Sequence, residues 1–140
     1  MTDRLSPAER SAHMRLIRKR DTSPELAVRR VAHALGLRFR LHRHGLPGTP
    51  DLVFPRLRKA ILVHGCFWHQ HKGCRLARQP KSRLDYWLPK LAGNVARDRK
   101  SRRALKMAGW TSLVIWECET RDLARLRATL QRFLLGGEDF

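Results

Sequence analysis

The sequence has few acidic residues and no long apolar run. Its 140 residues contain 12 Asp and Glu against 30 Lys and Arg, which leaves a net charge of +18. A membrane-spanning helix needs about 20 mostly apolar residues, and no segment supplies them. So large an excess of positive charge favours a polyanionic partner, and nucleic acid is the default expectation.

Cysteine is also scarce. Three cysteines cannot all pair within one chain, so a disulfide framework is not expected, and metal ligands or buried thiols remain. The first four residues, MTDR, do not begin the apolar stretch of a secretory signal. We therefore expect a soluble, monomeric, cytoplasmic protein.

A chain of this length is typical of one domain. We expect residues 21–135 to form its core and residues 1–20 to form a basic arm. A short helix is expected at Ser11 to Arg20, with Met14 and Ile17 on one face.

Apolar periodicity predicts the element order α-β-β-β-α-β-α. The first core helix should begin with a Ser23 cap and Pro24 in its first turn, and end at Gly36. The later elements are strands at 37–41, 51–54 and 60–63, a helix at 82–107 that breaks near Pro89, a strand at 112–116 and a helix at 122–135. This order predicts an α/β fold with a mixed central sheet flanked by helices.

All three cysteines can be placed around one loop. Cys66, His71 and Cys74 lie close together in sequence, and Cys118 follows the 112–116 strand. Such a thiolate-rich set of four ligands favours structural zinc, which would staple the loop to the sheet. Two alternatives remain open: inert thiols with solvated histidines, or a site that uses His69 in place of His71.

An aspartate and two histidines mark a candidate catalytic site. Asp51 opens a strand, His64 ends the next strand, and His69 lies across the loop from it. An aspartate in this position holds Mg²⁺ in some nucleases. The second acid and the lysine of the usual nuclease pattern are missing, however, because those positions fall near Val63 and His64. By spacing alone, Asp51 is more often a turn residue.

A set of short motifs is far more specific. In order, they are Thr22-x-x-Glu25, Leu46-Pro47-Gly48-x-Pro50-Asp51, His64-Gly65-Cys66-Phe67-Trp68-His69, Tyr86-Trp87-Leu88-x-Lys90, Asn94-Val95-x-Arg97-Asp98, Gly109-Trp110 and Trp116-Glu117-Cys118. From about Ser11 to Phe133, the chain resembles the very short patch repair (Vsr-type) DNA mismatch endonucleases.

The resemblance implies a restriction-endonuclease-like three-layer fold with structural Zn²⁺ and catalytic Mg²⁺. It also implies nicking of double-stranded DNA 5′ to the thymine of a T·G mismatch, which arises when 5-methylcytosine deaminates. Location at the nucleoid and cooperation with other mismatch-repair proteins are further expectations.

The same resemblance assigns roles in catalysis. Asp51 would bind the metal, His69 would activate water, and Asp98 would orient His69. His64 would contact or protonate the scissile phosphate region, and Glu25 would hold the outer shell of a metal. Val63 stands where the family usually has a threonine, which leaves only a backbone carbonyl for Mg²⁺. The zinc ligands match Cys66, His71, Cys74 and Cys118, with one residue inserted at Lys72–Gly73.

DNA contacts follow from the resemblance and from the charge. Phe67, Trp68 and Trp87 would wedge into one groove, while Met14 and Ile17 on the N-terminal helix clamp the other. Trp110 and Trp116 are expected in the core. The candidate contacts to DNA are Arg15, Arg18, Lys19, Arg20, the run 81–83, Lys90, Asn94, Arg97 and the rest of the run 97–103.

Two rival functions remain. One is a sequence-specific nicking or restriction-type endonuclease of the same fold that requires no mismatch. The other is a zinc-stabilised DNA-binding protein whose catalytic site has decayed, which Val63 alone favours. A deaminase is not expected, because the His-x-Glu and Cys-x-x-Cys pairs of that class are absent from the sequence.

Overall fold

The structure is a computed structural model that describes residues 21–136. The expected helix at Ser11 to Arg20 therefore lies outside the described residues. So do its candidate DNA contacts, which are Met14, Arg15, Ile17, Arg18, Lys19 and Arg20.

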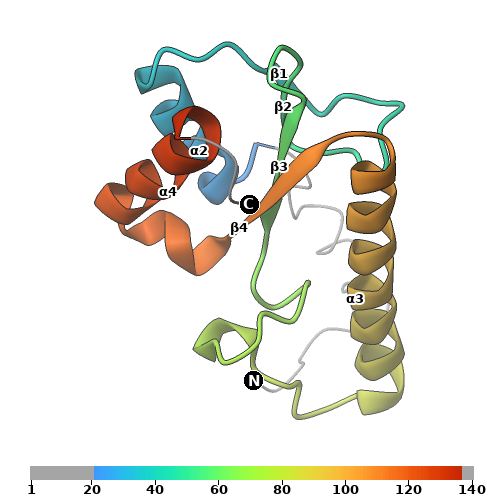
Figure 1. The fold of residues 1–140 in the computed structure, drawn as a ribbon. Coiled ribbons are helices and arrows are strands. Elements are labelled where there is room, and N and C mark those ends of the chain that lie inside the picture. The colour runs from blue at the N-terminus through green and yellow to red at the C-terminus, as the bar shows by residue number, and fades with distance from the viewer. Residues whose placement is uncertain (1–20, 137–140) are drawn as a thin grey trace.

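A four-stranded mixed sheet forms the centre of the fold (Figure 1). Its strands lie in the order β1 (Arg40–Leu41), β2 (Leu52–Phe54), β3 (Lys59–His64) and β4 (Thr111–Trp116). The β1–β2 and β2–β3 pairs are antiparallel, and the β3–β4 pair is parallel. Two parallel neighbours need a long crossover, and α3 (Leu84–Met107) provides it. The predicted mixed α/β architecture is confirmed.

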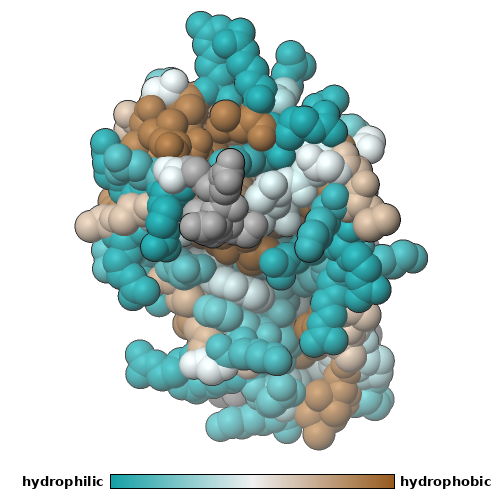
Figure 2. All heavy atoms as spheres, viewed as in Figure 1, coloured by the Kyte–Doolittle hydropathy of each residue, from teal (hydrophilic) through white to brown (hydrophobic). Residues whose placement is uncertain are grey.

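Helices cover both faces of this sheet. Figure 1 shows α2 (Ser23–Ala34) and α4 (Leu123–Leu135) on one side and α3 on the other. The larger core contains Val28 of α2, Phe133 of α4 and Ile61 of β3, among others. The smaller core joins Leu105 of α3 to Leu62 of β3. Figure 2 shows hydrophilic side chains over most of the surface in this view.

Alternation along β3 decides which layer each of its side chains meets. Ile61 and Val63 pack in the core with α2 and α4, whereas Ala60 and Leu62 belong to the core with α3. Successive strand residues point to opposite faces. His64, which is 5% exposed, therefore lies on the face covered by α3.

The turn before β2 approaches α3 closely. Gly48 has a φ of 75°, and a Cβ built on it would lie 2.8 Å from the Cβ of Ser101. Glycine is needed here because a side chain would be strained by the backbone angle and would also collide with α3. This close approach helps to fix the path of the chain into Asp51.

Three local predictions are wrong. Thr22, and not Ser23, caps α2, because the Thr22 side chain accepts a hydrogen bond from the backbone N–H of Glu25. The expected strand at 37–41 is reduced to β1, since only its last two residues pair with β2. Finally, α3 continues through Pro89 without a break. Pro89 lies in the second turn, where its missing N–H removes a single helical hydrogen bond.

Two short 3₁₀ helices were not predicted. Arg75–Ala77 forms η1 inside the Cys/His loop, and Glu117–Arg121 forms η2 directly after β4. Cys74 directly precedes η1, and Cys118 lies within η2, whose turn places it beside the loop. None of the helices in the described part of the chain is long and apolar enough to cross a membrane.

Candidate functional site

Asp51 lies at the start of β2, and its carboxylate is bound by the neighbouring strand. The backbone N–H of Val63 donates to Asp51 Oδ2 at 2.6 Å. Burial raises the pKa of Asp51 to about 6, and the nearby Glu25 carboxylate also raises it. Two carboxylates held together away from water are poorly compensated, which is the condition that favours a bound cation or proton.

Glu25 lies in the first turn of α2 and is almost fully buried, at 3% exposure. Its Oε2 accepts the backbone N–H of Asp21 at 2.9 Å and the Arg29 guanidinium at 3.2 Å. His42 Nε2 lies 3.2 Å from the same oxygen and 3.8 Å from Asp51 Oδ1. The ligand atoms of Glu25, His42 and Asp51 all lie within 4.8 Å of one another, so the three side chains could hold a metal ion.

A second cluster joins the end of β3 to α3. His69 Nδ1 lies 2.6 Å from Asp98 Oδ2, and the rings of His64 and His69 stack at 3.8 Å between centroids. Burial, followed by the neighbouring His69, lowers the pKa of His64 to about 4. At neutral pH the His64 ring is therefore uncharged in the free protein.

Both clusters contact the end of β3. Val63 binds the Asp51 carboxylate through its backbone, and the next residue, His64, stacks on His69. Glu25 comes from α2 and Asp98 from α3, which are helices on opposite faces of the sheet. Adjacent residues at the end of β3 thus contact an acidic cluster and an imidazole pair.

The four predicted zinc ligands also converge. Cys66, His71, Cys74 and Cys118 place one ligand atom each within 4.8 Å of one another. His71 Nδ1 lies 3.6 Å from Cys66 Sγ and 3.5 Å from Cys118 Sγ. Burial raises the pKa of Cys66 to about 12. This thiol is therefore protonated at neutral pH unless a cation binds. His69 pairs with Asp98 and is not part of this group.

Trp116 supports the Cys/His cluster and is not a core residue. It was expected in the core, as was Trp110, which is buried. Instead, the half-buried Trp116 ring stacks on His71, with 4.1 Å between ring centroids and 7° between ring planes. Its other neighbour is the ring of His64, at 5.2 Å. Trp116 therefore lies between the Cys/His cluster and the imidazole pair.

Phe67, Trp68 and Trp87 form one half-buried aromatic cluster. Their three ring-to-ring distances are 5.5, 5.5 and 5.7 Å. Lys90 Nζ lies 5.5 Å from the Trp68 ring, and the Asn94 side chain donates to the Trp68 carbonyl at 3.0 Å. Arg97 in turn donates to the Asn94 side chain. The structure thus brings the predicted wedge residues together beside polar groups of α3.

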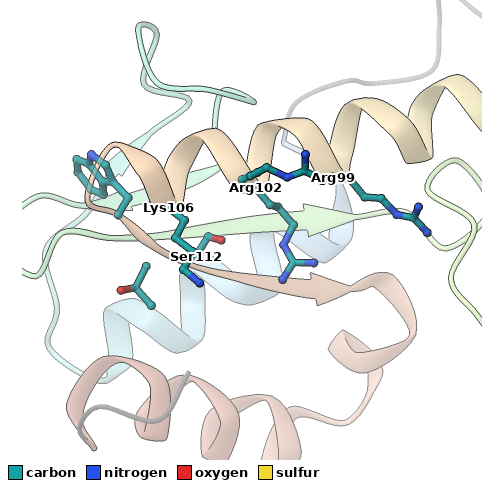
Figure 3. Close-up of a pocket in the computed structure, with 7 residues that line it drawn as sticks. Arg99, Arg102, Lys106 and Ser112 are labelled. Carbon is teal, nitrogen blue, oxygen red and sulfur yellow. The ribbon is translucent and has the colours of Figure 1, made fainter.

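A basic groove runs between α3 and the start of β4 (Figure 3). It has a volume of about 450 Å³ and is lined by Arg99, Arg102, Arg103, Lys106, Trp110, Thr111 and Ser112. The three arginines belong to the run 97–103 that is predicted to contact phosphates, whereas Lys106 lies outside that run. The spacing 99, 102, 103 and 106 places all four cations on one helix face, a signal that would have found it.

His42 was also missed. His42 belongs to none of the motifs, and only the structure shows that it lies beside Glu25 and Asp51. No sequence signal distinguishes it from His44, two residues further on, which is exposed.

Comparison with known proteins adds an independent finding. The family model described as "DNA mismatch endonuclease Vsr" matches residues 2–75, a range that contains Glu25, Asp51, His64 and His69. The "Type II nicking enzyme V.XorIIP" of Xanthomonas oryzae is 54% identical over 134 residues, which cover 96% of this chain and 98% of that protein. The "DNA mismatch endonuclease Vsr" of Escherichia coli is 41% identical over 126 residues, covering 90% of this chain and 80% of that protein. The "Type II nicking enzyme V.NmeAIP" of Neisseria meningitidis is 36% identical over 134 residues, covering 96% and 95%.

Proposed function

Because this chain belongs to the Vsr family of DNA mismatch endonucleases, we propose that it nicks one strand of double-stranded DNA 5′ to the thymine of a T·G mismatch, using a divalent cation such as Mg²⁺. The observation that carries this proposal is that Asp51, beside Glu25, and His69, paired with Asp98, contact two adjacent residues at the end of β3, Val63 and His64. A restriction-endonuclease-like fold and a monomeric state are parts of the same proposal.

Asp51 and Glu25 suit a divalent cation. Their carboxylates are close, largely buried and short of positive charge, and hard oxygen donors are the ligands that Mg²⁺ prefers. Asp51, with the backbone carbonyl of Val63, would hold the ion, and Glu25 would hold its outer shell. When bound, the ion would neutralise charge on the scissile phosphate.

His69 is the proposed base. If the Nδ1–H of His69 donates a hydrogen bond to Asp98 across the 2.6 Å contact, the free lone pair of the His69 ring is on Nε2. That nitrogen can take a proton from an attacking water, and the carboxylate stabilises the imidazolium that results.

His64 is better suited to contact a phosphate oxygen than to protonate the leaving group. Its lowered pKa keeps the ring neutral at neutral pH in the free protein, so the ring can donate through one N–H but carries no spare proton. Its Nδ1 is buried without a hydrogen-bond partner among the described residues.

Zinc is the proposed ion of the Cys/His cluster. Three cysteines and one histidine form a closed set of four ligands, which is typical of structural zinc sites. Zinc there would fix the loop that carries His69, Phe67 and Trp68, and would tie it to Cys118 beyond β4.

DNA would lie across the aromatic cluster and the basic groove. The aromatic rings would enter the stack at the mismatch, where separating base pairs costs less than at a paired step. The groove between α3 and β4 would hold the phosphate backbone, since its lining has four cations and no acidic residue. Residues 1–20 would add a basic arm on the opposite side, and residues 21–135 would form the catalytic core.

A panel of end-labelled duplexes tests this function. Each duplex carries T·G, C·G or T·A at one position, with either strand labelled, and is incubated with and without Mg²⁺. We expect one nick, 5′ to the mismatched thymine, only with T·G and only with the ion. The variant Asp51→Ala should bind the same duplex without cutting it, and normal nicking by this variant would remove Asp51 from the mechanism.

A second candidate function is a sequence-specific nicking enzyme that needs no mismatch. The names of relatives favour it, because the 54% and 36% identical proteins are called type II nicking enzymes. Equal nicking of the C·G and T·G duplexes would support this alternative. Binding to T·G DNA without any nicking would instead support a decayed DNA-binding protein.

A further inference from the structure

His42 is held beside the candidate cation site by its own backbone. It directly follows β1 and has a φ of 44°, in the left-handed region that residues other than glycine seldom occupy. Its N–H donates to the carbonyl oxygen of Asp51 at 3.1 Å. The hydrogen bond therefore fixes the main chain of His42 against that of Asp51.

The His42 side chain turns inward toward two carboxylates. It is 12% exposed, and its Nε2 lies 3.2 Å from Glu25 Oε2 and 3.8 Å from Asp51 Oδ1. Two donors that bind one cation at about 2.1 Å each, at right angles, lie about 3 Å apart. A shift of under about 1 Å would therefore let His42 Nε2 and Asp51 Oδ1 bind one ion, with Glu25 Oε2 beside them.

Protein cations do not fully balance these carboxylates. The Arg29 guanidinium is shared between Glu25, at 3.2 Å, and Asp21, at 2.7 Å. Asp51 receives a backbone N–H from Val63 at 2.6 Å. A cation bound between Asp51 and Glu25 would complete this charge balance, and His42 could turn a nitrogen lone pair toward it.

We propose that His42 Nε2 is a direct ligand, together with Asp51, of the divalent cation in this site, whose outer shell Glu25 would hold, and that the site consequently prefers Mn²⁺ or Co²⁺ to Mg²⁺. The inference rests on the proposed function, because it concerns the cation of the same site. Mg²⁺ selects oxygen donors and keeps much of its water, whereas imidazole suits transition metals.

Binding without DNA tests this directly. The full chain is first loaded with Zn²⁺ to fill the Cys/His cluster and is then titrated with Mn²⁺ or Mg²⁺ by calorimetry. We expect Mn²⁺ to bind at least about 10-fold more tightly than Mg²⁺. Even residues that only support a metal ligand typically contribute 10–100-fold to affinity. His42→Gln should therefore lose at least about 10-fold for Mn²⁺ and change Mg²⁺ binding much less. The matched control is His44→Gln, because His44 is exposed and lies outside the cluster.

A spectroscopic measurement separates a ligand from a neighbour. Electron spin echo modulation of bound Mn²⁺ should reveal a directly coordinated imidazole nitrogen in the wild-type protein and in His44→Gln, and not in His42→Gln. Any one of three results would overturn the proposal. They are absence of this signal in the wild type, its persistence in His42→Gln, and a failure of Mn²⁺ to bind the free protein. These wild-type readings do not depend on whether the variant folds.

Failure of the proposal and failure of the proposed function give different results. If the protein binds Mn²⁺ through His42 but leaves T·G duplexes intact, the ligand proposal stands and the proposed function is wrong. If the protein nicks T·G duplexes but no imidazole nitrogen is coordinated to the bound Mn²⁺, the proposed function stands and the ligand proposal is wrong.

Discussion

The rings of His64 and His69 lie face to face, with centroids 3.8 Å apart and planes only 6° apart, and both approach one carboxylate. Asp98 Oδ2 is 2.6 Å from His69 Nδ1, and Asp98 Oδ1 is 4.0 Å from His64 Nε2. Stacked imidazoles cannot both be charged without repulsion, so His69, with the closer carboxylate, is the one that can take a proton. In the proposed mechanism, this difference makes His69 the base and His64 the neutral hydrogen-bonding group.

Asp98→Asn should therefore slow nicking while leaving DNA binding intact. An amide cannot stabilise the His69 imidazolium, and general-base catalysis typically contributes 10²–10⁴-fold. We expect kcat to fall at least about 100-fold, with Kd for the T·G duplex within about threefold of the wild-type value. Single-turnover nicking and fluorescence anisotropy measure the two quantities. Asp85→Asn, at an exposed position of the same helix, is the control. An unchanged kcat for Asp98→Asn would contradict the assignment.

The stability of the metal-free protein should depend on pH through Asp51 and His64, with opposite signs. The pKa of Asp51 is raised from 3.8 to about 6, so its contribution to stability is fully present below pH 3.8 and is lost as pH rises through about 6. The pKa of His64 is lowered from 6.5 to about 4, so its contribution is present above pH 6.5 and is lost as pH falls through about 4. The free energy of unfolding of the wild type should consequently change little with pH between about 4 and about 6, because the two contributions oppose each other there.

Asp51→Asn separates the two contributions. The amide has no charge to bury, so the variant should be more stable than the wild type at pH 7 without metal, by up to about 3 kcal/mol. The free energy of unfolding of this variant should fall steadily as the pH is lowered, because the contribution of His64 is no longer offset by the opposite contribution of Asp51. Urea unfolding in the presence of a chelator, from pH 4 to 7, measures both effects. Asp122→Asn is the control, since asparagine also caps a helix. A variant less stable than the wild type at pH 7 would disprove this account.

Removing metal from the Cys/His cluster should destabilise the fold. Without a cation, the buried Cys66 returns to the thiol form, and Cys118 is no longer tied to the loop. We expect chelation or Cys118→Ser to lower the free energy of unfolding by about 3 kcal/mol or more. Metal content and thermal unfolding test this, and Lys72→Ser, an exposed change in the same loop, should have little effect. Equal stability with and without bound metal would show that the cluster has no structural role.

Trp68→Ala should reduce discrimination of the mismatch. Its ring packs on Phe67 and Trp87 at 5.5 and 5.7 Å, so its loss opens the aromatic cluster. A stacked base is worth about 1–3 kcal/mol. Affinity for the T·G duplex should therefore fall about 5- to 150-fold, and affinity for the C·G duplex should fall less. Trp68→Phe keeps an aromatic face and should recover much of the difference. Equal losses for both duplexes would argue against insertion at the mismatch.

Lys106→Gln should weaken DNA binding uniformly. Lys106 lines the groove between α3 and β4, where a phosphate contact carries no sequence information (Figure 3). Affinity for T·G and C·G duplexes should fall by the same factor, and the slope of log K against log salt should decrease by about 1. Arg127→Gln changes an exposed cation of α4, on the opposite side of the sheet, and should leave the slope unchanged. An unchanged slope for Lys106→Gln would exclude this groove from the DNA contacts.

Local sequence patterns predicted most of the fold, and they failed where contacts between residues distant in the sequence determine the local structure. The apolar run at 60–63 correctly indicated a strand covered on both faces, because such a run has no polar side. Pro89 suggested a break, yet α3 remains continuous. The Ser23-Pro24 start was likewise displaced by one residue, because either Thr22 or Ser23 could cap the helix locally.

The sequence by itself determined the order of the elements, the strong positive charge and the four converging zinc-type ligands, because these depend on composition, on neighbours within one loop or, for Cys118, on its place directly after a strand. Only the tertiary structure decided that His42 faces Glu25, 17 residues away. The pairing of His69 with Asp98, 29 residues away, was expected from the family resemblance alone and is present in the structure. Such pairs depend on how helices pack on the two faces of a sheet. That packing is fixed by the whole core, and no local spacing encodes it.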